Sequence, residues 1–400
     1  MEGDRQRNTV TDDLVVQNDW HLSLKDACSQ FYIGLRRPGV GKSEYFDVQT
    51  TKLIDEWSFT VLPGKSGENT VRDTDFTVTM DEHKHLHVTY AGKTTVFVSP
   101  TKEQTVVGFE SAPHCIDFSP SGSTYIVADA SGHLMVRNAR HNQTMVTLRG
   151  QTMDIYRCRI YPSGEVALAG GMDMAIRIWA IDTGRCAKTL QGHVAAVTGL
   201  GIFGVGKTIV SCSNDGSARI WSCGSGENTE TFVLEAGKCI DLAAARKGYR
   251  FAVICELNQL SVIVLDAHRT KHNIQLPSAP TTVCFSDDET GEVAFVGFED
   301  GHVAAYQMSS QQMIGEIRTE KGSVTSVAHK GTRLFVSFNG GCVTVYQVPT
   351  LASLAAGDAT TIRAEFELTG PDCDPVYDIS VQKNTVVTCC RDHKIRLYDL

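Results

Sequence analysis

The sequence has no excess of positive charge. Its 37 lysines and arginines face 46 aspartates and glutamates, which gives a net charge of −9. Proteins that bind nucleic acid need clustered basic side chains for phosphate contacts, so the composition argues against a nucleic-acid partner. It favours a partner with a basic surface.

The sequence also lacks long apolar runs. No uninterrupted run approaches the ~18 residues that span a bilayer. The opening residues, MEGDRQRNTVTDD, lack the apolar segment of a signal peptide. We therefore expect a cytoplasmic protein, with the nucleus as a second location, and no membrane partner.

Paired cysteine motifs are absent as well. The 13 cysteines are scattered, and no two have CxxC spacing, which argues against a zinc ribbon or a thioredoxin-type redox site. Most of them lie inside apolar runs such as TTVCFS and VVTCCRD. We expect reduced, mostly buried thiols and no cofactor.

What the sequence does contain is a repeat. Four segments place an aspartate six residues before an aromatic side chain, and weaker copies end at Arg137, Leu265 and Tyr346. The seven units end at positions 137, 179, 221, 265, 306, 346 and 398. A spacing of about 42 residues is typical of the four-stranded blades of β-propellers. No segment shows a helical apolar period of useful length.

The repeat resembles the WD40 repeat and predicts an all-β fold, a seven-bladed WD40 β-propeller over residues 101–400. Residues 1–12 are expected to be disordered. Residues 13–100 contain six or seven apolar stretches without the repeat, and predict a small N-terminal β-rich domain. The chain stops after the third strand of unit seven, so we expect residues 101–109 to supply its fourth strand and to close the ring.

One unit shows the complete side-chain tetrad of the WD40 family. In that family the histidine, serine, aspartate and tryptophan bond in series and stabilise the blade. Here these residues are His193, Ser211, Asp215 and Trp221. We interpret them as structural and not as a hydrolase triad.

Two glycine-rich motifs imitate a phosphate-binding loop. Residues 201–208 match GxxxxGK[ST], but the strand-like sequence TIVSCS follows where a P-loop requires a helix. The match at Gly39–Ser43 is weaker. We therefore predict a turn without nucleotide and no catalytic residues, so the protein is not expected to be an enzyme.

Three histidines alternate at positions 83, 85 and 87. On a strand they would share one face and could bind Zn²⁺ or Ni²⁺. Asp81 and Glu82 are the only further ligands nearby. We favour an exposed polar strand with no metal, and the metal alternative stays open.

Propellers usually bind partners across one face, and the repeat predicts which residues lie on that face. Nine candidate partner-binding residues follow from two kinds of position in the repeat. One kind flanks the start of the first strand of a unit, and the other directly precedes the turn aspartate. They are Asp154, Tyr156, Met172, Asn214, Lys238, Glu299, Asp374, Tyr377 and Arg391. Tyrosine, methionine and arginine are favoured interface residues, and the carboxylates suit a basic partner.

A narrower resemblance involves both ends of the chain. Residues 368–400, with DCDPVY and TCCRD, resemble the C-terminal end of the proteasomal ATPase-associated factor family, as does YPSGEVALAGGMDMAIRIW. LVVQNDWHLSLKD resembles the opening segment of that family. The resemblance implies a non-catalytic, monomeric chaperone that binds the C-terminal domain of a proteasomal AAA-ATPase subunit while the regulatory particle base assembles.

The alternative is a WD40 scaffold or substrate receptor in a ubiquitin ligase. Adaptors of the cullin type often carry WDxR, which neither Trp179-Ala180 nor Trp221-Ser222 provides. The sequence leaves open which ATPase is bound, what releases it and what the N-terminal domain contacts.

Overall fold

The computed structural model describes residues 13–24, 30–36, 44–52, 56–63, 72–151, 153–245, 249–265, 269–288, 291–348, 362–371 and 374–400. Within these ranges the regular structure is almost entirely β-strand. The exceptions are two single 3-10 turns, η1 (Trp20–Leu22) and η2 (Asp73–Asp75). The expected disordered segment 1–12 lies outside the described residues.

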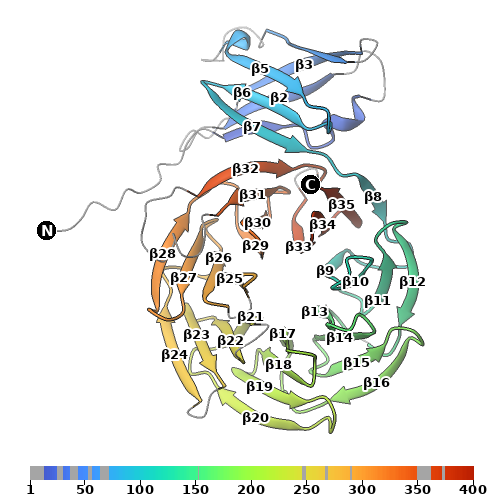
Figure 1. The fold of residues 1–400 in the computed structure, drawn as a ribbon, viewed down its shortest axis with the longest axis vertical. Helices are drawn as coiled ribbons and strands as arrows, with labels where there is room; N and C mark the ends of the chain where they lie inside the picture. The colour runs from blue at the N-terminus through green and yellow to red at the C-terminus, as the bar shows by residue number, and fades with distance from the viewer. Residues whose placement is uncertain are drawn as a thin grey trace, which may run out of the picture.

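From β8 onward the described strands form seven antiparallel blades around a central axis (Figure 1). Blades one to three contain β9 (Pro113–Phe118), β10 (Thr124–Asp129), β11 (Leu134–Asn138), β12 (Gln143–Leu148), β13 (Ile155–Ile160), β14 (Val166–Gly171), β15 (Ile176–Ala180), β16 (Arg185–Leu190), β17 (Val197–Phe203), β18 (Thr208–Ser213), β19 (Ser217–Ser222) and β20 (Asn228–Val233).

Blades four to six follow the same order, from the innermost strand to the rim. They contain β21 (Cys239–Ala244), β22 (Arg250–Cys255), β23 (Gln259–Val264), β24 (Thr270–Gln275), β25 (Pro280–Phe285), β26 (Val293–Phe298), β27 (Val303–Gln307), β28 (Gln312–Ile317), β29 (Val324–Lys330), β30 (Arg333–Phe338), β31 (Val343–Gln347) and β32 (Arg363–Leu368). The predicted all-β propeller is therefore confirmed.

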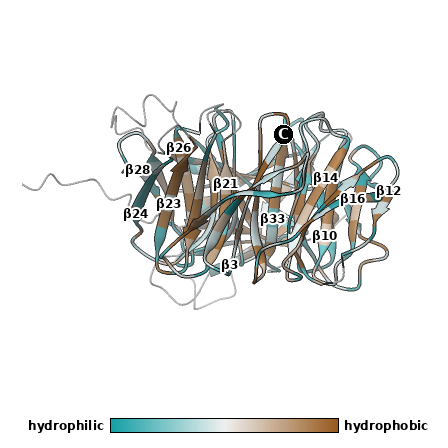
Figure 2. Cartoon of the chain, turned by 90° about the horizontal axis from the view of Figure 1, so that it is seen from below, coloured by the Kyte–Doolittle hydropathy of each residue, from teal (hydrophilic) through white to brown (hydrophobic). Residues whose placement is uncertain are grey.

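Burial explains why these segments are strands. The second strand of a blade lies between two neighbouring blades, and in β26 all six residues are buried. The outer strand faces solvent on one side, so exposure alternates along β24. Figure 2 shows this difference, with apolar colour along β23 and hydrophilic colour on β24 and β28.

The seventh blade combines both ends of the propeller sequence. It contains β33 (Val376–Gln382), β34 (Thr385–Cys390), β35 (Lys394–Asp399) and, as its outer strand, β8 (Lys102–Thr105). Strand β8 is antiparallel to β35, and Glu103 forms ion pairs with Lys394 at 2.5 Å and with Arg396 at 2.7 Å. Strand β8 lies within the segment 101–109 and covers the outer edge of β35.

The described residues of the N-terminal part form seven strands, at the segments predicted from their apolar runs. The first four form one sheet, in the order β1 (Asp13–Val16), β2 (Gln30–Arg36), β3 (Glu44–Lys52) and β4 (Trp57–Val61). The other three continue the sheet of blade six: β5 (Phe76–Met80), β6 (Leu86–Tyr90) and β7 (Lys93–Val98). The boundary at residue 100 stays a prediction, because this sheet crosses from one part to the other.

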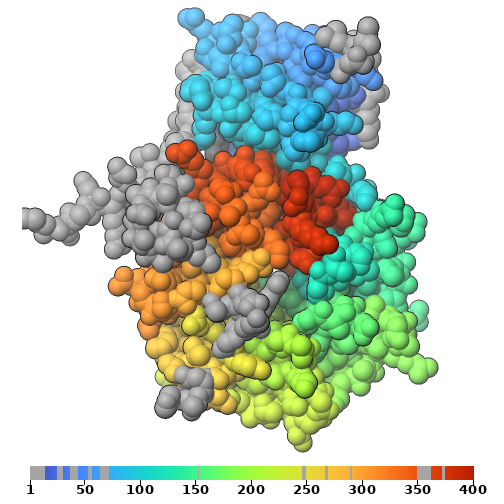
Figure 3. Space-filling model, in the orientation of Figure 1, coloured from blue at the N-terminus to red at the C-terminus, as the bar shows by residue number. Residues whose placement is uncertain are grey.

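The contact between the two parts is a parallel strand pair. Strand β7 pairs with β32, which would otherwise be an open edge of blade six. In the buried seam the Trp20 indole donates to Thr369 Oγ1 at 3.0 Å, and the Tyr398 hydroxyl donates to the Thr369 carbonyl at 2.8 Å. Figure 3 shows the N-terminal part packed against blades six and seven.

Candidate interaction face

The nine candidate residues lie at one end of the propeller. Asp154, Lys238 and Asp374 precede innermost strands, whereas Met172, Asn214, Glu299 and Arg391 follow second strands. Tyr156 and Tyr377 are the second residues of their innermost strands. In each blade the start of the first strand and the end of the second meet at the same end of the ring. We call this end the candidate face.

Backbone hydrogen bonds show that the positions correspond from blade to blade. The amide after the second strand donates to the carbonyl before the first strand in six blades. Examples are Met172 to Asp154 at 2.9 Å and Arg391 to Pro375 at 3.0 Å. Strand β22 has the same bond from Glu256 to Lys238, so Glu256 is an equivalent position that the sequence analysis missed because blade four lacks the turn aspartate.

All nine residues are at least partly exposed, but their charges are not equally free. Arg391 bonds Asp374 at 2.8 Å, and Lys238 lies 3.8 Å from Glu256. Asp154 and Glu299 have no side-chain hydrogen bond or ion pair within the described residues. These two carboxylates can therefore receive a basic group without losing an internal partner.

Aromatic side chains line part of the channel mouth at this face. The His114 ring lies 5.1 Å from Tyr377 and 6.1 Å from Tyr156, edge to face in both pairs. Burial lowers the pKa of His114, so its imidazole is neutral at pH 7. The sequence analysis missed His114, although it follows the start of β9 as Tyr156 follows that of β13.

The four tetrad residues of blade three bond in series. The Trp221 indole donates to Ser211 Oγ at 2.8 Å, and Ser211 Oγ lies 2.8 Å from His193 Nε2. His193 Nδ1 lies 2.7 Å from Asp215 Oδ2. The series connects Trp221 of β19 and Ser211 of β18 to His193 in the connection before β17 and to Asp215 in the turn after β18. It therefore braces two strands of the blade against two of its connections.

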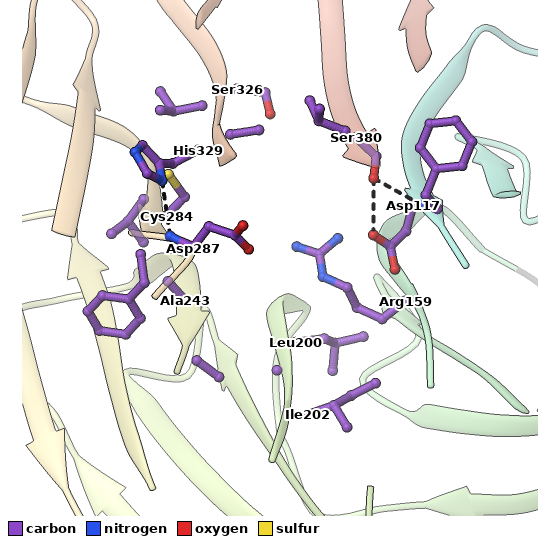
Figure 4. Close-up of a pocket in the computed structure, with 18 of the residues that line it drawn as sticks. Asp117, Arg159, Leu200, Ile202, Ala243, Cys284, Asp287, Ser326, His329 and Ser380 are labelled. Atoms are coloured by element: carbon purple, nitrogen blue, oxygen red, sulfur yellow. Dashed lines mark hydrogen bonds between the residues drawn. The ribbon is translucent and has the colours of Figure 1, made fainter. Parts of the chain in front are cut away.

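A cavity of about 590 Å³ occupies the centre of the ring, towards the face opposite the candidate face. In Figure 4, Arg159 and Asp287 project into it from opposite sides. Most of its charges have internal partners: Arg157 pairs with Asp241 at 3.1 Å and Lys330 with Asp287 at 3.0 Å. Burial raises the pKa of Asp117 to about 6.

The buried carboxylates around this cavity have a structural role. Each innermost strand is a sheet edge with unpaired amides. Asp378 accepts from the Ile116 amide at 3.0 Å and Asp117 from the Ile160 amide at 2.9 Å, in each case in the next blade. Asp241 accepts from Val283 in the same way. The aspartates of HCIDF, KCIDL and VYDIS thus connect neighbouring blades.

The segment 201–208, which matches the P-loop motif, contains a hairpin turn between β17 and β18. Gly201 lies in β17, Gly204 and Gly206 have φ of 52° and 93°, and Thr208 begins β18. A strand therefore follows where a phosphate site needs a helix N-terminus. The weaker match at 39–43 lies outside the described residues.

The histidine triplet does not occupy one strand face, so that expectation is wrong. Strand β6 begins at Leu86, and Lys84 with φ of 64° places His83 and His85 in the preceding turn. His85 and His87 both contact Asp81, at 3.2 and 3.1 Å. Among the described residues no three His, Cys, Asp or Glu side chains are arranged to hold a metal ion.

Cysteine burial agrees with the prediction for most positions that the structure describes. Seven of these thiols are buried, whereas Cys186 is exposed. All eleven described cysteines are free thiols. No helix among the described residues is long and apolar enough to cross a bilayer.

Comparisons with known proteins support the fold. The family model "WD domain, G-beta repeat" matches residues 142–180, 184–222 and 363–399. The solved structures titled "Structure of U3-55K" and "Crystal structure of RRP9 WD40 repeats" each align with a TM-score of 0.68 at 14% identity. They cover 76% of this chain and 100% and 98% of their own chains. The chain thus has the β-propeller fold of these structures, and three of its segments match the WD repeat.

Curated relatives match only part of this chain and only part of their own length. "26S proteasome regulatory subunit RPN14" of Saccharomyces cerevisiae is 26% identical over 240 residues, which are 53% of this chain and 58% of that protein. "Autophagy-related protein 16" of Arabidopsis thaliana is 22% identical over 195 residues, 48% of this chain and 38% of its own length. The chain thus spans less than two thirds of the relatives it matches.

Proposed function

We propose that this protein is a non-catalytic assembly chaperone that binds the C-terminal domain of a proteasomal AAA-ATPase subunit through the candidate face. The similarity to the yeast proteasome regulatory subunit is the observation that carries the proposal. The resemblance of the two chain ends to the proteasomal ATPase-associated factor family supports the same assignment. The propeller supplies a broad surface, and its described residues include no arrangement that points to catalysis.

The charge of the candidate face supports a basic partner. In the described connections at this end, the exposed acidic residues are Glu110, Glu235, Glu256, Glu299, Asp300 and Glu320. The exposed basic residues are Arg149, Lys238, Arg318 and Arg391, and three of these four are paired within the protein. Complementary charge of this kind steers association and selects among partners.

Affinity purification from cells with quantitative mass spectrometry tests the proposal. Free ATPase subunits of the regulatory particle should dominate the bound fraction, with little proteasome core particle. Isolated ATPase C-terminal domains should then bind the purified protein directly. Recovery of cullin-ligase components without ATPase subunits would replace the chaperone by the ubiquitin-ligase scaffold.

A further inference from the structure

Exposed methionines gather at the candidate face of blade two. Met153, Met172 and Met174 are 47%, 49% and 43% exposed. We call these three residues the methionine patch. The amide of Met172 donates to the Asp154 carbonyl, which holds the two methionine-bearing turns side by side.

The blade does not need these side chains for its own core. They lie in connections between strands, where solvent-facing residues are ordinarily polar, and the core clusters of blades one to three do not include them. A contiguous exposed apolar patch commonly marks a protein-binding site. Methionine suits such a site because its unbranched thioether adapts to the shape of a partner.

A free carboxylate lies within the patch. Asp154 follows Met153 in the chain, and its side chain has no partner among the described residues. The neighbouring Asp173 is already bonded to Gln151 at 3.1 Å and paired with Arg177. The partly buried Tyr156 lies two residues after Asp154. The patch therefore offers an apolar surface with one unneutralised negative charge.

We infer that the methionine patch is the anchoring part of the candidate face and that it takes a protein segment whose apolar side chains are flanked by lysine or arginine. One of these basic groups pairs with Asp154. The inference rests on the proposed function and names the part of the face that supplies most of the affinity. Desolvated apolar anchors near the centre of an interface usually carry most of the binding energy.

Methionine-methyl NMR tests the patch with a defined probe. The full chain has nine methionines, and it is labelled with ¹³C at their methyl groups. A short amphipathic peptide of leucine and lysine should shift the signals of Met153, Met172 and Met174. The signals of the exposed Met145 and Met313, on outer strands, should stay in place. A peptide with glutamate for lysine should shift none.

Shifts of equal size at Met145, or none in the patch, would overturn the inference. Self-association of the protein, measured by sedimentation, would also overturn it if the patch signals moved with protein concentration and not with peptide. The occupant would then be a second copy of the chain. Thermal unfolding confirms that each variant used below is folded.

Binding to the ATPase C-terminal domains gives the second arm. The double substitution Met172→Gln with Met174→Gln, and Asp154→Lys separately, should weaken binding at least about tenfold. The controls Met145→Gln, on the rim of blade one, and Glu165→Lys, on the opposite face of blade two, should stay within about twofold. Glu165 is exposed, and its carboxylate has no partner among the described residues.

The two arms separate the inference from the proposed function. If a C-terminal domain binds wild type and the double variant equally, the methionine patch is not the anchor, although the proposed function stands. If no ATPase domain binds wild type, the proposed function fails, and the peptide experiment alone decides the patch.

Discussion

At the scale of single residues, stability depends on buried polar groups that have one specific partner each. Ser211 Oγ accepts from the Trp221 indole and bonds His193, and it is completely buried. Loss of this one oxygen leaves two buried groups unpaired. The geometry therefore makes the tetrad sensitive to small changes.

Ser211→Ala should lower the free energy of unfolding by about 2–6 kcal/mol, since each of the two unpaired buried groups costs about 1–3 kcal/mol. Denaturant titration followed by tryptophan fluorescence measures the change. Ser225→Ala, in an exposed turn of the same blade, should change stability by less than about 0.5 kcal/mol. Equal effects of the two substitutions would refute the structural role of the tetrad.

The tetrad also predicts a pH dependence. Burial lowers the pKa of His193 below its ordinary value of 6.5, although Asp215 acts in the opposite direction. The unfolded chain then binds the proton more readily, so this residue's contribution is complete above pH 6.5 and is lost as the pH falls through the folded pKa.

Unfolding at pH 7.5 and 5.5 should show a smaller pH dependence in His193→Gln than in wild type. The difference cannot exceed about 1.4 kcal/mol per pH unit, the value for one proton. His141→Gln, in an exposed turn, serves as the control. An unchanged slope in His193→Gln would show that another group is responsible.

At the scale of elements, two strand pairs decide how the chain closes on itself. Strand β8 completes blade seven, and β7 covers the edge of blade six. These two strands are consecutive in sequence, so ring closure and attachment of the N-terminal part depend on one short segment. An exposed sheet edge at either place would invite pairing between molecules.

Deletion of residues 101–109 should therefore cause aggregation, because β35 would lose its outer partner strand and Arg396 one of its two carboxylates. Size-exclusion chromatography with light scattering measures the outcome. A stable monomer with a wild-type melting temperature would show that the ring closes without β8.

Thr369→Val should weaken the seam between the two parts while preserving side-chain shape. The buried Trp20 indole loses its acceptor, at a cost of about 1–3 kcal/mol. Hydrogen exchange should then increase in β7 and β32 more than in β18. Thr385→Val, at the partly exposed first residue of β34, is the control and should leave exchange in the seam unchanged.

At the scale of the whole molecule, the net charge and its distribution influence the rate and the selectivity of partner binding. The protein carries −9 overall, and on the candidate face the carboxylates of Asp154 and Glu299 have no partner within the part of the chain that the structure describes. Asp374 is less informative for mutagenesis, because its removal also releases Arg391. Electrostatic steering by exposed charges should weaken as salt screens them.

Binding to an ATPase C-terminal domain should fall by about tenfold between low and high salt. Glu299→Lys should weaken binding at low salt and reduce this dependence, whereas Glu165→Lys should do neither. Isothermal calorimetry at several salt concentrations measures both. A salt-independent affinity would contradict the electrostatic part of the proposal.

The sequence by itself determined the repeat, the number of blades and the strand that closes the ring, because periodicity and the pattern of a missing strand are local properties of the chain. It also placed nine residues on one face, since each position is fixed relative to its own blade. It misplaced His83 and His85, because a turn residue with positive φ interrupts the alternation.

Only the tertiary structure decided which long-range partners meet. Trp20 and Thr369 are 349 positions apart, and no pattern in either segment indicates the parallel pair of β7 and β32. The same holds for the face: Asp374 is already paired, whereas Asp154 has no side-chain partner among the described residues, and a backbone bond joins the turn of Met172 to the connection that carries Met153. Such contacts depend on how segments that are far apart in the sequence come together in space, and the local repeat of the sequence contains no information about this.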